Sequence, residues 1–323
     1  MAWHSHPVRV ASLVPSATES LFALGLGDQV VAVTHECDYP PEALRLPRLT
    51  RSVIPEGLRP HEIDAMVHEV TDRGDPLYEL AEGQLAAVAP DLIATQALCA
   101  VCAVSYDDVR AVAERLEAKP EVISLDPSSL TEVLDDLVRL AKALGVRHRG
   151  ERLRVALEAR LDRVRDAVAG AQRPRVVTLE WLAPPYAGGH WVPEMVEIAG
   201  GRSVAGEPQG DSRIVGWSEL RGADPDVAVV MPCGLYAEEA AQQALDHRDE
   251  LESLGAQRIY AVDAASSFSR PGPRLVEGVE LLAHLLHPDR MPAPPALTFR
   301  ELSPRPSAVR GTRASNQYQR KSR

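Results

Sequence analysis

The chain has 323 residues, of which 45% are hydrophobic and 25% charged, as in ordinary globular proteins. This length exceeds that of a usual single domain and predicts two domains. The formal net charge is −11, but residues 290–323 carry eight basic residues and one acidic residue. The remaining 27 basic and 45 acidic groups (35 − 8 and 46 − 1) leave a body of charge −18, which repels phosphates and argues against nucleic-acid binding.

The first predicted lobe covers residues 8–125 and begins with an apolar strand that ends before Pro15. Ser16 and Glu19 have the spacing of a capping box, so a helix is expected to start there. Strands that alternate with helices indicate parallel βα units. Two more apolar runs predict strands at residues 29–34 and 91–95.

Residues 126–173 are predicted to connect two lobes through helices. Ser129 and Glu132 have capping-box spacing at the start of the first helix. From residue 149 to residue 169, Leu and Val recur at helical spacing with charged residues between them. The pattern predicts one helix of about six turns, which would make a stiff spacer.

The second predicted lobe covers residues 174–288 and repeats the organisation of the first. Pro-Asp turns at residues 90 and 225 each precede a short apolar strand and then a cysteine. We therefore predict an α/β fold of two Rossmann-like lobes with parallel sheets, joined by one long connector helix, with a ligand cleft between them. The basic tail, residues 289–323, lacks apolar periodicity and is predicted to be disordered.

The compartment is predicted from the start of the chain. Residues 1–7 lack a basic signal-peptide region, and the first apolar run is broken by Pro15. No segment approaches the ~20 apolar residues that a membrane helix needs. As written, the sequence predicts a cytoplasmic monomer without a membrane span. A start site further upstream would instead make the protein periplasmic or attached to the cell surface.

Four cysteines follow strands of the predicted sheets, where ligands of parallel sheets bind. Cys99 and Cys102 could form a redox pair. Together with Cys37 and Cys233, or with His35 or His190 in place of one thiolate, they could hold zinc or an iron–sulfur cluster. Alternatively, the cysteines are small packing residues near a ligand. Disulfides are disfavoured, because the chain is too large to need them.

Aromatic residues make up only 4% of the chain, yet Trp181, Tyr186 and Trp191 fall within one Pro- and Gly-rich segment. Such a segment either lines a site for a flat, largely apolar ligand or forms a local satellite core. Arg270 or Arg274 could bind phosphate or carboxylate groups. Neither a Ser–His–Asp order nor paired catalytic carboxylates stand out, so no enzyme activity is predicted.

Several motifs occur in the order found in one known family: LVPSATE at residues 13–19, CDYPPEA at 37–43, PDLIATQ at 90–96, GGHWVPEMVEIAGG at 188–201 and PGPRL at 271–275. With these motifs the chain resembles the vitamin B12 (cobalamin) substrate-binding proteins of ABC importers. These are class III periplasmic binding proteins, a class that also binds iron–siderophores and haem. The resemblance implies two lobes that clamp a ligand with little hinge closure.

The resemblance also implies which side chains contact the ligand. Glu36, Trp181, His190 and Arg270 join this predicted site because of their places in the sequence. The residues that the resemblance itself puts near the ligand are Pro15, Tyr39, Gln96, Tyr186, Trp191 and Phe268.

The chain departs from the family at two positions. Importer-bound members carry a docking glutamate for the permease where this chain has Gly83 and Ser218, although Glu82 and Glu219 are adjacent. In lacking these two glutamates and in having four cysteines, the chain is similar to a cytoplasmic, cysteine-bearing branch of the family. The sequence therefore leaves undecided whether the protein docks on an ABC permease.

Our leading hypothesis from the sequence is a non-enzymatic protein that binds cobalamin or a related corrinoid. Trp181, Tyr186 and Trp191 would cover the ring, while His35, His190 or a thiolate could approach the cobalt. The first alternative is a metalloprotein or enzyme with cysteine-bound zinc or an iron–sulfur cluster. The second alternative is an ABC receptor for a siderophore or haem.

Overall fold

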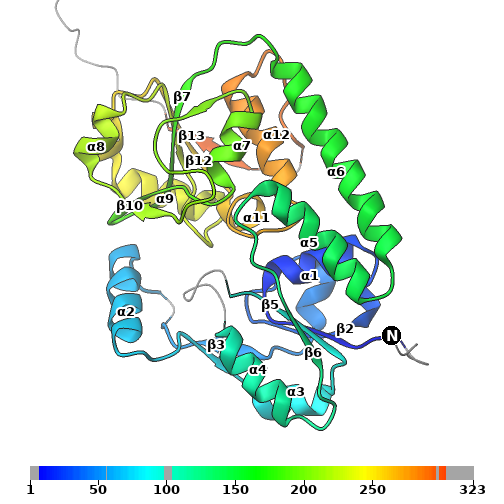
Figure 1. The fold of residues 1–323 in the computed structure, drawn as a ribbon. Helices are drawn as coiled ribbons and strands as arrows, with labels where there is room; N and C mark the ends of the chain where they lie inside the picture. Colours follow the sequence, from blue (N-terminus) through cyan, green and yellow to red (C-terminus); the bar gives the residue numbers. More distant parts are fainter. Residues whose placement is uncertain (1–6, 56, 98–103, 296–297, 303–323) are drawn as a thin grey trace, which may run out of the picture.

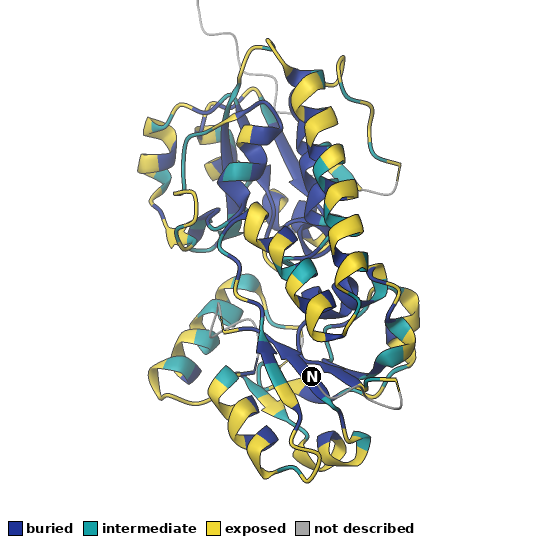
Figure 2. Ribbon diagram, turned by 45° about the vertical axis from the view of Figure 1, so that its right-hand side comes forward, coloured by how far each residue is buried: buried dark blue, intermediate teal, exposed yellow. Residues whose placement is uncertain are grey.

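The computed structural model describes residues 7–55, 57–97, 104–295 and 298–302. Two α/β lobes lie one above the other and are linked along one side by two helices (Figure 1). These are α5 (Leu130–Ala143) and α6 (Arg147–Val168). Buried residues concentrate in the sheets and on the inner faces of the helices, whereas the outer faces of the helices are exposed (Figure 2).

The N-terminal lobe has a four-stranded parallel sheet in the order β2-β1-β5-β6. Its apolar strands are buried on both faces, because α1 and α5 pack on one side and α3 and α4 on the other. The strands are β1 (Val10–Ser12), β2 (Val30–Val33), β5 (Leu92–Thr95) and β6 (Glu121–Ser124). The helices of this lobe are α1 (Pro15–Ala23), α3 (Glu82–Val88) and α4 (Tyr106–Arg115), with 3-10 turns η1 (Gly27–Gln29) and η2 (Pro41–Arg45).

A separate small unit follows β2 in the chain. The strands β3 (Thr50–Ser52) and β4 (Tyr78–Leu80) pair antiparallel to each other. Between them in sequence, α2 (Pro60–Asp72) is amphipathic and begins with a capping interaction between Arg59 and Glu62. In Figure 1, α2 extends from the N-terminal lobe toward the strand β10 of the other lobe.

The C-terminal lobe has a seven-stranded mixed sheet. Its central strands are parallel. β8 and β13 pair antiparallel with β7 and β12, and β10 pairs antiparallel with β8. The strands are β7 (Arg175–Leu182), β8 (Pro185–Ala187), β9 (Arg202–Ser203), β10 (Arg213–Ile214), β11 (Val227–Val230), β12 (Arg258–Val262) and β13 (Phe299–Glu301). The helices are α7 (Val192–Ile198), α8 (Trp217–Gly222), α9 (Ala237–Asp246), α10 (Arg248–Ser253), α11 (Ala264–Ser267) and α12 (Leu275–Leu286).

This architecture confirms the predicted fold class of two Rossmann-like lobes joined by one long helix. The second sheet is not wholly parallel, because short antiparallel strands complete its edges. The segment predicted as a loop after residue 180 is instead a hairpin of β7 and β8, followed by α7.

The prediction that the tail is disordered from residue 289 onward is wrong for its first part. Strand β13 lies within that segment and pairs with β12. Phe299 packs edge-on against Tyr260, with ring centroids 6.0 Å apart, and joins the core of the C-terminal lobe. One aromatic side chain and an unpaired sheet edge are thus enough to order a segment whose composition suggested disorder.

The connector is held by close helix packing. Leu157, Leu161 and Val164 of α6 are buried with α5 and α12 in the largest core cluster. Gly150 lies where α6 meets α5. A Cβ atom at this position would lie 2.9 Å from the Val138 Cα atom, so the close approach of the two helices requires glycine. None of the helices in the described residues is long and apolar enough to cross a membrane.

We predict that Gly150→Val destabilises the protein by about 2 kcal/mol, because the added methyl groups meet backbone atoms of α5 and force the helices apart. Urea unfolding followed by circular dichroism measures this change. Val155→Ala on the exposed face of the same helix is the control and should change the stability by less than about 0.5 kcal/mol. Equal effects of the two substitutions would contradict the packing argument.

Candidate ligand-binding site between the lobes

The loops at the carboxyl ends of the parallel strands face each other across the two lobes. Asp38, in the loop after β2, accepts hydrogen bonds from Tyr236 and Arg270 of the C-terminal lobe. Arg270 also donates to the Glu36 carbonyl oxygen at 3.2 Å. Carboxyl ends of parallel strands are where open α/β sheets bind ligands, so these loops define the candidate site.

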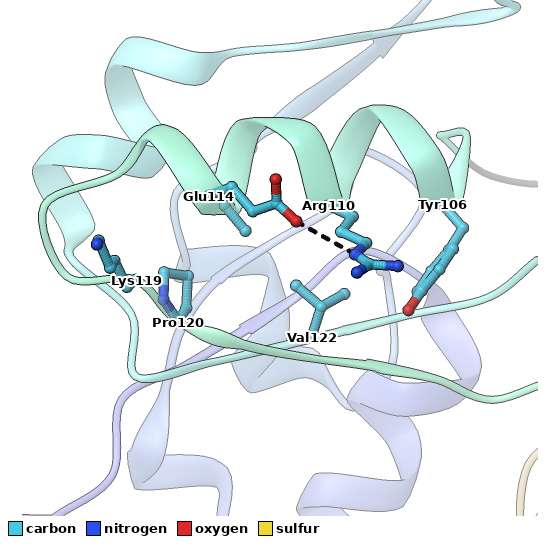
Figure 3. A pocket seen from close by; sticks show the side chains of 7 residues that line it. Tyr106, Arg110, Glu114, Lys119, Pro120 and Val122 are labelled. Atoms are coloured by element: carbon cyan, nitrogen blue, oxygen red, sulfur yellow. Dashed lines mark ion pairs between the residues drawn. The ribbon is translucent and has the colours of Figure 1, made fainter.

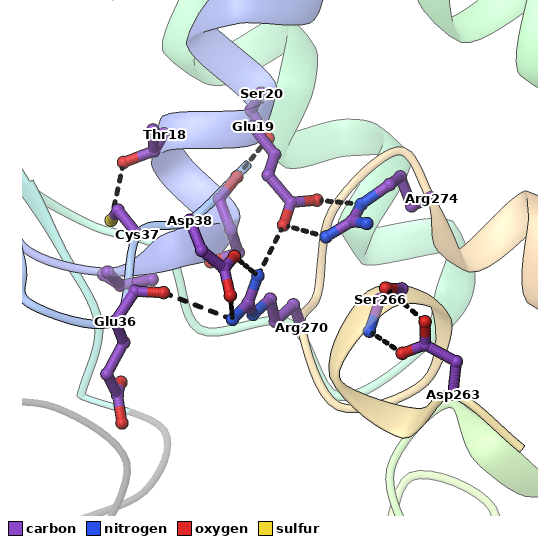
Figure 4. A network of polar contacts seen from close by, with 12 residues as sticks. Thr18, Glu19, Ser20, Glu36, Cys37, Asp38, Asp263, Ser266, Arg270 and Arg274 are labelled. Atoms are coloured by element: carbon purple, nitrogen blue, oxygen red, sulfur yellow. Dashed lines mark hydrogen bonds and ion pairs between the residues drawn. The ribbon is translucent and has the colours of Figure 1, made fainter. Parts of the chain in front are cut away.

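Two arginines of the C-terminal lobe bind one buried carboxylate of the N-terminal lobe (Figure 4). Arg274 donates from Nε to Glu19 Oε2 at 2.8 Å and from Nη2 to Oε1 at 2.6 Å. Arg270 Nη1 lies 3.3 Å from Glu19 Oε1 and 2.6 Å from Asp38 Oδ1. We call Glu19, Asp38, Arg270 and Arg274 the inter-lobe ion-pair network.

Local structure places both sides of this network. Glu19 lies on α1, which starts at Pro15 and is buried along most of its length. On the other side, Asp263 caps α11 by accepting hydrogen bonds from the Ser266 amide and hydroxyl, both at 2.8 Å. The chain then crosses to the N-terminal lobe, where Gly272 passes so close that a Cβ atom would lie 3.5 Å from the Ser16 carbonyl oxygen.

The charges of the network stabilise each other. Burial alone would raise the pKa of Asp38, but hydrogen bonds from Arg270 and Tyr236 outweigh it and lower this pKa below its usual value. Burial and the hydrogen bond to Asp38 raise the pKa of Tyr236 to about 12, so its phenol stays protonated. Tyr39 is 45% exposed, and its ring faces the Arg274 guanidinium at 4.1 Å.

A second group of polar side chains lies beside this network, and we call Glu36, Tyr78, Glu180 and Cys233 the acidic cluster. Burial raises the pKa of Glu180 to about 7, against the opposing effect of hydrogen bonds from Ser212 and the Gly189 amide. Burial likewise raises the pKa of Glu36, although Arg270 opposes it. Burial and the charges of Glu180 and Glu36 raise the pKa of Cys233 to about 11.

These couplings join residues of both lobes. Glu36 and Tyr78 come from the N-terminal lobe, whereas Glu180 lies near the end of strand β7 and Cys233 follows β11. Solvent reaches Cys233, yet surrounding protein atoms make its ionisation unfavourable, so the thiol is neutral at pH 7.

An aromatic hairpin borders the acidic cluster. Trp181 of β7 and Tyr186 of β8 are directly opposite each other in the antiparallel pair, and both are half-buried. The Trp181 indole N–H donates to the Ala183 carbonyl at 3.2 Å. Burial, and then the charge of Asp64 on α2, raises the pKa of Tyr186.

Two of the predicted ligand contacts lie in the protein core. The Trp191 side chain is 6% exposed and Phe268 is 2% exposed, and both belong to the core of the C-terminal lobe. The Trp191 indole N–H donates to the Phe268 carbonyl at 2.8 Å, which ties α7 to the end of α11. Trp191 thus packs as part of a core, whereas Trp181 and Tyr186 are half-buried on the hairpin of β7 and β8.

The remaining predicted contacts differ in accessibility. Pro15 is buried at the start of α1, and Gln96, just after β5, is 7% exposed. His190 has a positive φ of 49°, and its Nε2 atom is shielded and lies 3.4 Å from Asp211. His35 Nδ1 lies 2.7 Å from the Thr50 hydroxyl. Neither histidine joins the ion-pair network.

The predicted cysteine site is not assembled by the described residues. Cys37 does not face the other lobe, because it is fully buried in the N-terminal core with its sulfur 3.0 Å from the Thr18 hydroxyl. Burial raises its pKa to about 11, which disfavours the thiolate that a metal needs. Cys99 and Cys102 lie outside the described residues. Within the described part of the chain, no three His, Cys, Asp or Glu side chains could hold a metal ion.

A surface pocket of about 720 Å³ lies elsewhere, between α4 and β6 of the N-terminal lobe (Figure 3). Tyr106 and Val122 line it together with Arg110 and Glu114, which form an exposed ion pair of 3.3 Å. The pocket shares no residue with the ion-pair network or the acidic cluster, so it is not part of the inter-lobe site.

Several site residues could not be recognised in the sequence. Glu19 was assigned only a capping role, and Tyr78 and Tyr236 carried no signal. Their partners lie far away in the chain: Glu19 and Arg274 are 255 residues apart. The sequence did single out Glu36, Cys233, Arg270 and Arg274 by their places after predicted strands.

Comparison with known proteins identifies the family. Residues 10–262 match the family model described as periplasmic binding protein. The chain belongs to this family. It is therefore a substrate-binding protein of the kind that serves ABC importers, as the sequence motifs predicted, and its class is non-catalytic.

Relatives and solved structures agree with this assignment. An uncharacterized ABC transporter substrate-binding lipoprotein of Bacillus subtilis is 25% identical over 290 residues, which cover 88% of this chain and 81% of the relative. The Vitamin B12-binding protein of Vibrio cholerae is 56% identical over 41 residues, 13% of this chain and 15% of the relative.

The solved structures share the fold at low sequence identity. The periplasmic vitamin B12 binding protein BtuF of Vibrio cholerae has a TM-score of 0.63 at 22% identity, covering 87% of this chain and 97% of that structure. A periplasmic heme binding protein from Pseudomonas aeruginosa has a TM-score of 0.67 at 22% identity, covering 92% and 99%.

These findings correct the predicted compartment. The prediction of a cytoplasmic protein is wrong, because the chain belongs to a family of periplasmic binding proteins and its relatives are a lipoprotein and periplasmic proteins. The start of the sequence was not a sound basis for that prediction.

We predict that Glu19→Gln lowers the free energy of unfolding by about 3 kcal/mol, since it leaves two buried arginines without their shared charge partner. Urea unfolding measures this loss. Glu79→Gln is the matched control, because Glu79 also pairs with an arginine but on the surface, where the expected loss is below about 1 kcal/mol. Losses of similar size would show that the network contributes little.

A second prediction concerns pH. Asp38 has a folded-state pKa below its usual value of 3.8, so it stabilises the folded state fully above pH 3.8 and less as pH falls through the lowered pKa. The difference in unfolding free energy between the native protein and Asp38→Asn should therefore be constant near neutrality and shrink in acid. Unfolding curves measured from neutral pH down to about pH 3 test this. A difference that grows in acid would contradict the assignment.

Proposed function

We propose that this protein binds a cobalamin-type corrinoid between its lobes, as the substrate-binding component of an ABC importer. The observation that carries the proposal is the half-buried aromatic pair Trp181 and Tyr186, which lie opposite each other on the hairpin of β7 and β8. Strand β8 pairs with β10, toward which α2 of the other lobe extends (Figure 1). Flat faces of this kind suit a large ring ligand.

Two further observations support a corrinoid. The local identity of 56% is to a Vitamin B12-binding protein. In addition, α6 and the inter-lobe ion-pair network connect the lobes at separate places, which suits a site that is formed before the ligand arrives. Of the ligand contacts predicted from the sequence, the proposal keeps Tyr39, Glu36, Trp181 and Tyr186.

Haem is the second candidate, because a heme binding protein shares the fold over 92% of this chain. Haem and corrinoids are both large flat rings, so the aromatic pair alone does not separate them. Their edges differ: haem carries two carboxylates, whereas a corrin ring carries amides. Direct titration with cyanocobalamin, cobinamide and haemin decides between the two, with tryptophan fluorescence and calorimetry as readouts.

The proposed partner is an ABC permease. Gly83 and Ser218 stand where the resemblance implies docking glutamates. The adjacent Glu82 is paired with Arg115 at 3.0 Å, and Glu219 is paired with Arg213 at 2.6 Å. Docking through Glu82 and Glu219 would therefore have to compete with ion pairs inside each lobe.

We predict that Trp181→Ala and Tyr186→Ala each weaken corrinoid binding about tenfold, the loss expected when one aromatic contact is removed. Calorimetric titration with cyanocobalamin measures the affinity. Tyr106→Ala, which removes a tyrosine from the separate pocket of Figure 3, is the control and should bind normally. Unchanged affinity in both hairpin variants would refute this placement of the ligand.

A further inference from the structure

Three side chains form a row across the edge of the C-terminal sheet. Trp181 of β7 is directly opposite Tyr186 of β8, and Tyr186 is directly opposite Ile214 of β10. The side chains of directly opposite residues lie on the same face of a sheet. The residues that follow them in the chain are buried in one core cluster of the lobe: Leu182, Ala187 and Val215. Because successive side chains of a strand point to opposite faces, the row points away from this core, and we call it the outer strip.

The outer strip is accessible at the edge of the lobe. Ile214 is 52% exposed, and Trp181 and Tyr186 are both half-buried. Strand β10 is the last strand on this side of the sheet, so no further strand among the described residues covers Ile214. One face of a flat ring can lie on an apolar row of this kind.

Helix α2 of the N-terminal lobe extends toward this edge of the sheet (Figure 1). Its apolar side chains recur at helical spacing and share one face: Ile63, Met66, Val67 and Val70. Only Val70 is buried, and none of the four belongs to a core cluster of either lobe. Apolar surface that a protein leaves partly uncovered is typical of a binding site.

The polar contacts of α2 are local. Arg59 pairs with Glu62 at the start of the helix. Arg73 pairs with Glu69 near its end. Among the described residues, no hydrogen bond or ion pair joins α2 to the C-terminal lobe, whereas the inter-lobe ion-pair network and α6 connect the lobes elsewhere. The helix can therefore move without breaking a polar contact between the lobes.

A glycine with left-handed backbone conformation lies on each side of α2. Gly57 has a φ of 81° and Gly74 a φ of 74°. A Cβ atom at either position would meet no atom within 4 Å, so the backbone conformation, and not packing, favours glycine there. Such positions allow the change in backbone dihedral angles that a hinge requires.

We propose that α2 is a lid: the ring ligand lies on the outer strip, and the apolar face of α2 closes over it from the other lobe. This inference rests on the proposed function and deepens it, because it names the surfaces that cover the two faces of the ring. Ile63, Met66 and Val67 contact the face that the outer strip leaves open. The charge of Asp64 on α2 acts on Tyr186, which agrees with this placement.

Closure of the lid stabilises the complex by removing the second face of a largely apolar ring from water. The lobes themselves keep their separation, because α6 and the inter-lobe ion-pair network hold them. Movement of α2 alone then admits and releases the ligand.

Hydrogen–deuterium exchange of the full chain tests the lid without any substitution. In the ligand-free protein we expect the amides of α2 to exchange at least about tenfold faster than those of the buried helix α1, because a helix with few buried contacts opens locally. Saturation with cyanocobalamin should slow the exchange of α2 by about tenfold or more. Helix α4, in the same lobe but at the separate pocket of Figure 3, should keep its rate.

Two substitutions on α2 place the same charge on opposite faces of the helix. Val67→Asp alters the apolar face, whereas Ala65→Asp alters the exposed face. We expect Val67→Asp to weaken cyanocobalamin binding about tenfold, since a charge then meets the apolar ring, and Ala65→Asp to bind as the native protein does. Calorimetric titration measures both affinities, and circular dichroism verifies that each variant is folded.

The outcomes separate this inference from the proposed function. Slow exchange of α2 in the ligand-free protein, at the rate of α1, overturns the lid for any ligand. If cyanocobalamin binds without slowing the exchange of α2, or binds equally to folded Val67→Asp and Ala65→Asp, the lid is overturned but corrinoid binding stands. If cyanocobalamin and cobinamide do not bind and haemin does, the proposed function fails, and slower exchange of α2 with haemin supports the lid for that ring.

Discussion

Glu19 is a carboxylate buried at the junction of the two lobes, and the arrangement of that junction depends on keeping its charge satisfied. A buried carboxylate without partners would be strongly destabilising. Arg274 and Arg270 meet this requirement from the other lobe, 255 and 251 residues away in the chain. The loop that carries them must therefore dock on α1, and with α6 it fixes the lobes at two separate places.

The same requirement shapes the ligand site. Both arginines are used to neutralise Glu19 and Asp38. Burial raises the pKa of both Glu36 and Glu180, the latter to about 7, beside the aromatic hairpin and a neutral thiol.

Much of the fold could be predicted because its signals are local. The apolar runs of the strands, the capping box at Ser129 and the Leu and Val spacing of the connector act over a few residues each. The capping box predicted at Ser16 is wrong, because α1 begins at Pro15 without a side-chain cap. Strands β8 and β13 were missed. Pairing at a sheet edge depends on a distant strand, so short edge strands leave little trace in sequence.

Within the site, the residue types were informative, but their directions were not. Trp191 and Phe268 stand in motifs that suggested ligand contact, yet both rings complete the core of the C-terminal lobe. Cys37 follows a strand as Cys233 does, but its side chain turns into the core beside Thr18. A strand end predicts the neighbourhood of a side chain, whereas packing decides whether it points inward or outward.

The sequence by itself determined the two-lobed α/β class, the long connector and the family, since each follows from periodicity or from ordered motifs. Only the tertiary structure decided which charged groups pair across the two lobes. Glu19, Glu36 and Glu180 are the same residue type in the sequence. Their surroundings differ because two arginines from the opposite lobe bind the Glu19 carboxylate, whereas burial raises the pKa of Glu36 and Glu180.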